Sequence, residues 1–226
     1  MKKYLLPALF TLVVVGIIVF AVRAATNPAN DAKPEDTQSP SVALSEEDKA
    51  ALKEGQIYGS SDKKIVLTEF ADFQCPACKF YEKTVEELRN TYKDQLTVIF
   101  KHYPLYPSPH KNAQVAAYAS EAAAKQGKFW EMHDKLFETQ DDWSELDDPK
   151  ETYITYASGI GLNVDQFKSD YDNKAGEGDI RRDKDFGTRL KLKGTPTFYL
   201  DGKLLDLKGD PSALKKAVED AIKAAQ

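Results

Sequence analysis

Short continuous apolar runs and longer helical patterns alternate along the chain from about residue 55 onward. The runs at 65–70, 96–100 and 197–200 predict strands, because a short apolar run suits a strand that is buried on both faces. Between 76 and 92 the apolar residues recur at three- to five-residue spacing, which predicts an amphipathic helix. The strand–helix–strand order over 65–100 predicts two parallel strands joined by a right-handed crossover.

The last part of the chain predicts a hairpin and a closing helix. Asp201-Gly202 is a strong two-residue turn signal after the strand at 197–200, and residues 203–205 form the returning strand. Asp210 then caps a helix whose apolar positions recur at helical spacing. The hairpin adds antiparallel strands to the parallel pair.

A long helical block separates the second strand from the hairpin. We expect its first helix to begin with Ser108 as N-cap and Pro109 in the first turn, and to run through an alanine-rich stretch to Ala124. Later helices are predicted at 129–137, 151–158, 164–171 and 179–190. The complete order predicts an α/β, thioredoxin-like fold with an all-helical insertion over about 108–192.

The N-terminal segment has a different pattern. Lysines 2 and 3 precede an uncharged, apolar stretch over 5–22, which predicts a transmembrane anchor or a cleaved signal segment over residues 1–23. The lysines stay on the cytoplasmic side, so the rest of the chain is expected outside the cytoplasm. An anchor gives a single-pass protein of the cell membrane, and cleavage gives a secreted or periplasmic one.

Residues 24–54 are expected to link this segment to the compact domain. They begin with a stretch that is rich in Pro, Asn, Asp and Ser and lacks hydrophobic periodicity, which predicts a flexible linker. A short helix within 44–53, with Ser45 as N-cap, is predicted at their end. The compact domain is then expected over 55–226.

Charge and cysteine content limit the classes of function that the sequence supports. The formal net charge is −5 and the basic residues are scattered, so the sequence does not support binding to nucleic acid. The only two cysteines, Cys75 and Cys78, lie in one tetrapeptide after the first strand. Residues three apart close too small a loop to stabilise a fold, so the pair serves either redox exchange or one half of a metal site.

A zinc site lacks the further ligands that it needs. The three histidines, His102, His110 and His133, do not form the paired spacing typical of zinc, and we expect them to be packing or surface residues. We therefore predict no metal and no cofactor. Redox exchange fits the position of the pair, because a helix N-terminus favours the thiolate of Cys75 and lowers its pKa. Cys78, one turn further, is expected to be buried and to resolve mixed disulfides.

Three blocks of the sequence resemble the DsbA-like thiol–disulfide oxidoreductases. They are Phe73-Gln74-Cys75-Pro76-Ala77-Cys78, the segment 127–137 in the helical block, and Gly194-Thr195-Pro196-Thr197-Phe198. The resemblance covers about residues 56–225. It implies a cis peptide bond at Thr195-Pro196 that faces Cys75, with the backbone of Thr195 free to pair with an extended substrate.

The same resemblance implies a role for Glu69, six residues before Cys75. The family places a buried acid beneath the disulfide, where its pKa is raised and it exchanges protons with Cys78. The alternative for Glu69 is an exposed charge at a strand edge.

Two positions between the cysteines bear on the reaction. Pro76 suits the first helical turn, where its missing N–H leaves no hydrogen bond unmade. The strongest oxidants of the family carry histidine at the position of Ala77, so this chain is expected to be a somewhat weaker oxidant.

The resemblance implies a membrane-tethered oxidase that acts on exported proteins with free thiols and is reoxidised by a membrane redox partner. Two alternatives stay open on the sequence. One is a reductase or isomerase of the same fold, and the other is a non-catalytic module that binds extended peptides.

Overall fold

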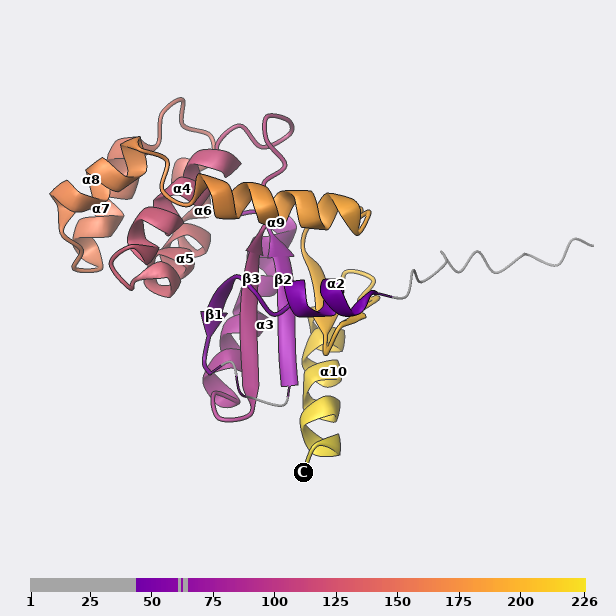
Figure 1. Cartoon of the computed structure of the whole chain (residues 1–226). Coiled ribbons are helices and arrows are strands. Elements are labelled where there is room, and N and C mark those ends of the chain that lie inside the picture. Colours follow the sequence, from indigo (N-terminus) through magenta and orange to yellow (C-terminus); the bar gives the residue numbers. More distant parts are fainter. Residues whose placement is uncertain (1–43, 61, 63–64) are drawn as a thin grey trace, which may run out of the picture. The chain divides into compact units, whose positions relative to one another are not determined.

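A five-stranded mixed sheet forms the centre of the protein (Figure 1). The structure is a computed structural model, and it describes residues 44–60, 62 and 65–226. The strands follow the order β1-β3-β2-β4-β5 across the sheet, so β2 is the middle strand. Their bounds are Gln56–Tyr58 for β1, Ile65–Ala71 for β2, Leu96–His102 for β3, Thr197–Leu200 for β4 and Lys203–Leu204 for β5.

The strand pairing confirms the predicted connections. β2 pairs in parallel with β3, to which α3 (Pro76–Thr91) connects it, and it pairs antiparallel with β4. The predicted turn at Asp201-Gly202 joins β4 to β5. The hydrophobic pattern does not predict β1, which pairs antiparallel with β3 at the edge of the sheet. Its three residues are too few for periodicity to show.

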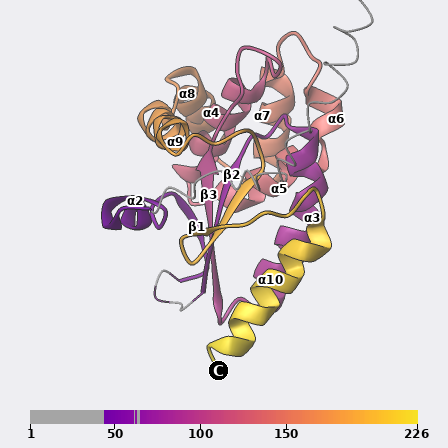
Figure 2. The same cartoon turned by 90° about the vertical axis from the view of Figure 1, so that its right-hand side faces the viewer.

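Helices cover both faces of the sheet (Figure 2). On one face α3 packs against the closing helix α10 (Pro211–Ala224), which Asp210 caps as predicted. On the other face lies α2 (Glu46–Ala51), and the next residue, Leu52, is buried in one cluster with Phe70 and Tyr199. Burial on both faces explains why β2 and β3 are apolar along most of their length.

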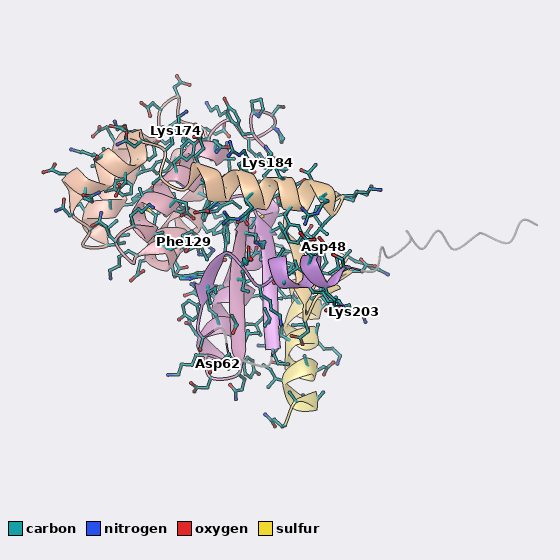
Figure 3. All side chains as sticks on the ribbon, viewed as in Figure 1. Asp48, Asp62, Phe129, Lys174, Lys184 and Lys203 are labelled. Atoms are coloured by element: carbon teal, nitrogen blue, oxygen red, sulfur yellow. The ribbon has the colours of Figure 1, made fainter. Side chains whose placement is uncertain are left out.

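The segment between β3 and β4 forms the predicted helical insertion (Figure 1). One apolar core runs through the insertion and up to the cysteines, because Cys75 and Cys78 belong to the same cluster as Phe129 and Phe137. Phe129 points from the insertion toward the sheet, where its ring lies 5.6 Å from that of Phe100 (Figure 3). The helices are α4 (Ala113–Ala124), α5 (Phe129–Glu138), α6 (Gln140–Trp143), α7 (Lys150–Gly159), α8 (Val164–Asp172) and α9 (Glu177–Arg189).

The first helix of the insertion begins at Ala113, so the predicted start at Ser108 and Pro109 is wrong. The preceding residues form a loop with cis peptide bonds at Tyr106-Pro107 and Ser108-Pro109. A helix capped by Ser108 would need the Asn112 N–H for its own first turn. That N–H donates instead to Gln74 Oε1, at 2.7 Å, so a contact with the cysteine segment replaces the helical hydrogen bond.

The compact unit begins at Leu44, earlier than the predicted boundary at residue 55. The predicted short helix is present as α2, and Ser45 caps it through a reciprocal pair of hydrogen bonds with Asp48. Leu52 is 2% exposed, and Asp48 accepts a hydrogen bond at 2.9 Å from Arg189 at the end of α9 (Figure 3). Residues 44–54 belong to the domain because they bury apolar surface against the sheet.

The predicted anchor or signal segment over 1–23, and the linker over 24–43, lie outside the described residues. Within the part of the chain that the structure describes, no helix has both the length and the apolar content needed to cross a bilayer.

Candidate active site

The cysteine pair lies where β2 passes into α3. Cys75 is the N-cap residue of α3, with an extended backbone, and Pro76 occupies the first turn as expected. The Cys75 N–H donates to the Asp72 carbonyl oxygen at 3.0 Å, which holds the turn between strand and helix. Both thiols are free, with Cys75 6% exposed and Cys78 fully buried. Since Pro76 and Ala77 are exposed, the helix end reaches the surface, and Cys75 is the outer sulfur of the pair.

The environment of Cys75 favours its thiolate. Its pKa is lowered to about 6, chiefly by a hydrogen bond from the Cys78 thiol. Burial acts against this shift, while Thr195 and the backbone N–H groups of Cys78 and Ala77 add to it. These N–H groups belong to the first turn of α3, whose donors have no partner within the helix. The geometry therefore provides the helix-terminus stabilisation expected from the sequence.

Cys78 has the opposite environment. Burial raises its pKa well above the ordinary thiol value, and the charges of Cys75 and Glu69 raise it further. At neutral pH the reduced pair therefore holds a thiolate at Cys75 and a thiol at Cys78. This asymmetry is what thiol–disulfide exchange requires of an attacking and a resolving sulfur.

Glu69 is buried in β2, at 1% exposure, so it is not an exposed charge at a strand edge. Burial raises the pKa of its carboxyl to about 8, while the Arg89 guanidinium opposes the shift. Its Oε1 has no hydrogen-bond partner among the described residues. A carboxyl with such a pKa is protonated at neutral pH and can give up its proton slightly above it.

The loop before β4 faces the outer sulfur. The Thr195-Pro196 peptide bond is cis, as the resemblance implies, and the Thr195 carbonyl oxygen lies 3.4 Å from Cys75 Sγ. The loop leads directly into β4, which pairs with β2, so the sheet fixes its position relative to the cysteines. Thr195 and Pro196 are both only partly buried.

The insertion contributes polar contacts that the sequence does not predict. Gln140 of α6 donates from Nε2 to the carbonyl oxygens of Phe73, at 2.7 Å, and of Cys75, at 3.0 Å. Gln74 in turn donates to the Ser144 carbonyl at 2.7 Å. For Gln74, its position directly before Cys75 is a sequence signal that it belongs to the active site. Gln140 is 65 residues from Cys75, so only the fold brings it there.

Of the three histidines, two are buried packing residues and one lies at the site. His133 is fully buried among aromatic rings, and His102 is buried with its Nε2 2.8 Å from Glu121 Oε1. His110 lies close enough to Cys75 for the two charges to interact, and its Nδ1 lies 2.6 Å from Asp72 Oδ2. The sequence predicts His110 as a surface or packing residue and does not predict its contact with Asp72, in the turn between β2 and α3.

One group in the described part of the chain has the composition of a metal site, namely Glu82, His133 and Asp134. The Arg89 guanidinium already lies among these side chains, 2.5 Å from Asp134 Oδ1 and 3.8 Å from Glu82 Oε1. It provides a positive charge at the place where a cation would bind. Neither cysteine belongs to this group.

A thiolate at a helix N-terminus and a buried resolving thiol, on a thioredoxin-like sheet, define the class of thiol–disulfide oxidoreductases. The comparison with family models agrees with this class. The chain belongs to the thioredoxin family, because the model described as Thioredoxin matches residues 51–220.

The curated relatives match this chain over part of their own length. The Na(+)/H(+) antiporter NhaA 3 of Salinispora tropica is 35% identical over 170 residues, which are 75% of this chain and 25% of the antiporter. The chain thus spans about a quarter of the length of the curated relatives it matches.

Solved structures agree on the fold. Oxidised BdbD from Bacillus subtilis matches with a TM-score of 0.64 and 23% identity, over 74% of this chain and 92% of that one. MdbA, a thiol–disulfide oxidoreductase from Actinomyces oris, matches with a TM-score of 0.61 and 17% identity, over 75% and 89% of the two chains. The expected DsbA-like fold, with its helical insertion, is thereby confirmed.

Proposed function

We propose that the protein is an extracytoplasmic oxidase that introduces disulfides into exported proteins through Cys75 and Cys78. The asymmetry of the pair carries this proposal, since the pKa of Cys75 is about 6 and that of Cys78 is raised. A stabilised Cys75 thiolate lowers the free energy of the reduced pair. The disulfide then gains electrons readily, which makes it an oxidant.

The proposed cycle starts from the oxidised pair. A substrate thiolate attacks the Cys75 sulfur, the bond between Cys75 and Cys78 breaks, and Cys78 leaves and takes up a proton. A second substrate thiolate then attacks the substrate sulfur of the mixed disulfide, and Cys75 leaves as a thiolate. The substrate loses two electrons, the pair gains them, and the products are a substrate disulfide and a reduced pair.

Two neighbouring residues assist these steps in our proposal. Glu69, whose pKa is about 8, gives a proton to Cys78 as it leaves and takes one back on reoxidation. The partly exposed backbone at Thr195 pairs with an extended substrate segment, in the manner of strand addition. The 3.4 Å separation between the Thr195 carbonyl and Cys75 Sγ supports this role, because a strand bound there passes the outer sulfur.

The proposed location rests on the residue pattern of 1–23. We propose a membrane tether with the domain outside the cytoplasm, where disulfides persist. Cleavage of the segment would release the same domain as a secreted or periplasmic enzyme. Each turnover leaves the pair reduced, so a membrane redox partner must remove two electrons from it.

The equilibrium of the purified domain with glutathione tests the direction of the reaction. We expect a potential clearly above that of thioredoxin, which is about −270 mV, although Ala77 keeps it below that of the strongest oxidants. A value near that of thioredoxin would instead identify a reductase, or an isomerase that a donor keeps reduced.

Cysteine variants test the mechanism. We expect Cys75→Ser to lose all oxidation of a reduced, unfolded test protein, because the attacked sulfur is gone. Cys78→Ser should accumulate a mixed disulfide with a test protein that already carries a disulfide, visible by non-reducing electrophoresis, because the Cys75 thiolate attacks that disulfide and no second sulfur of the pair resolves the product. If Cys75→Ser fully restored function in cells that lack the protein, this result would support the non-catalytic binding module.

A further inference from the structure

The Asp72 carboxylate is a buried negative charge next to the cysteine pair. Its side chain has 0% exposure, and its backbone contacts both cysteines. The carbonyl oxygen accepts the Cys75 N–H at 3.0 Å, and the Asp72 N–H donates to the Cys78 sulfur. An unpaired carboxylate at this position would oppose a second negative charge on Cys75.

His110 pairs with this carboxylate from the loop that precedes α4. Its Nδ1 lies 2.6 Å from Asp72 Oδ2, and its side chain is 13% exposed. The same carboxylate oxygen accepts the Leu105 N–H at 2.9 Å, so the loop is attached to Asp72 at two points. The hydrogen bond with Asp72 is the main reason why the pKa of His110 is raised, and the charges of Asp72 and Cys75 add to the shift.

We propose that His110 is a positioning residue for disulfide exchange, and that its imidazolium neutralises Asp72 so that Cys75 holds its thiolate. This inference rests on the proposed oxidase function and deepens it. The loop before α4 brings this positive charge to the active-site turn, where Asp72 accepts the Cys75 N–H. The exchange takes no proton from His110, so the exchange reaction itself is unchanged.

The consequence concerns the stability of the reduced pair. The reduced pair carries a negative charge on Cys75, and the disulfide carries none. A positive charge on His110 therefore stabilises the reduced form alone and makes the disulfide a stronger oxidant. When His110 is lost and Asp72 is kept, the carboxylate keeps only the backbone N–H groups of Gln74 and Leu105, at 2.7 and 2.9 Å, and the reduced form faces a buried charge without a counter-ion.

The test compares His110→Gln, Asp72→Asn and the double variant with the unchanged protein. Cys75 ionisation is followed by thiolate absorbance, and oxidant strength by the equilibrium with glutathione. For His110→Gln we expect the acid dissociation constant of Cys75 to fall about tenfold, which is one pKa unit. The equilibrium constant for reduction of the Cys75–Cys78 disulfide by glutathione should fall by about the same factor. Asp72→Asn and the double variant remove the carboxylate, so both should stay within about threefold of the unchanged protein.

Lys111→Gln is the matched control. Lys111 follows His110 in the loop, is exposed, and donates from Nζ to the Glu145 carbonyl at 2.9 Å. We expect this variant to leave both constants unchanged. A similar fall in Lys111→Gln, or in the double variant, would show that the loop acts through its packing, and would overturn the proposal. A His110→Gln protein with unchanged constants would overturn it as well.

The two proposals fail in different ways. The potential of the unchanged protein tests the oxidase function, whereas the difference between His110→Gln and the unchanged protein tests His110. If His110→Gln does not fold, His110→Asn provides the same comparison with a smaller side chain. An increase in the pKa of Cys75 in Asp72→Asn would contradict the view that the carboxylate opposes the thiolate.

Discussion

The Glu69 carboxyl lies in the middle strand of the sheet with 1% exposure, and its raised pKa of about 8 couples the chemistry of the pair to stability. A carboxyl whose folded pKa lies above its unfolded value of 4.5 binds a proton more tightly when folded. Its stabilising contribution is complete below pH 4.5 and is lost as the pH rises through about 8. The reduced protein should therefore become less stable over this interval.

Glu69→Gln removes this pH dependence. Relative to the unchanged protein, we expect little difference in the free energy of unfolding near pH 4. Above pH 8 the variant should be more stable, by on the order of 5 kcal/mol at most, because each pKa unit corresponds to about 1.4 kcal/mol. Urea unfolding of the reduced proteins across this range measures the difference. Glu86→Gln, on the exposed side of α3, should change stability by less than about 0.5 kcal/mol.

At the scale of elements, the sequence predicts those whose hydrophobic pattern is long or whose end signals are local. The strand before the cysteines, the crossover helix, and the turn at Asp201-Gly202 all have such signals. β1 and α6 do not, because they contain three and four residues. The prediction that the first helix of the insertion starts at Ser108 and Pro109 was wrong for a different reason. The Asn112 N–H, which that helix would use in its first turn, donates to Gln74 instead.

The short helix α6 contacts the cysteine segment through one side chain, that of Gln140. Gln140 is 3% exposed and donates to the carbonyl oxygens of Phe73 and Cys75. Gln140→Leu keeps the approximate volume but leaves both carbonyls without this donor. We expect a loss of about 1–3 kcal/mol in the free energy of unfolding, because the Phe73 carbonyl loses this donor and the Cys75 carbonyl keeps only the Lys79 N–H, at 3.2 Å. We also expect slower oxidation of a test protein, because the backbone at Cys75 is held less firmly.

Urea unfolding and the oxidation assay measure these effects. Gln166→Leu is the matched control, since Gln166 is exposed on α8 and donates to Asp170 at 2.8 Å. It should change neither quantity appreciably. A Gln140→Leu protein with unchanged stability would show that the two carbonyls find other donors.

At the scale of the whole molecule, the insertion and the sheet meet through buried charges. Lys101 of β3 is 2% exposed and its Nζ lies 2.8 Å from Asp183 Oδ1 on α9. The other oxygen of Asp183 accepts the His102 N–H at 3.1 Å. These partners are 82 residues apart, and Lys101 interrupts an apolar strand. From the sequence alone nothing assigns it a partner, because many acidic residues lie in the insertion.

This contact gives a prediction about how the insertion is held. Asp183→Leu leaves the Lys101 ammonium and the His102 N–H buried without their acceptor, and we expect it to cost about 3–5 kcal/mol in the free energy of unfolding. The double variant Lys101→Met, Asp183→Leu removes both charges and should recover most of this loss, because an apolar pair of similar volume often replaces a buried ion pair at no cost.

Denaturant unfolding of the single and double variants provides the measurement. The control is Asp179→Leu, which removes an exposed partner of Arg182 on the same helix and should cost less than about 1 kcal/mol. A double variant as unstable as Asp183→Leu would mean that the hydrogen bond to the His102 backbone, rather than the unpaired charge, dominates. Because Cys75 and Cys78 share a core with the insertion, Asp183→Leu should also weaken oxidation of a test protein, and the double variant should restore it.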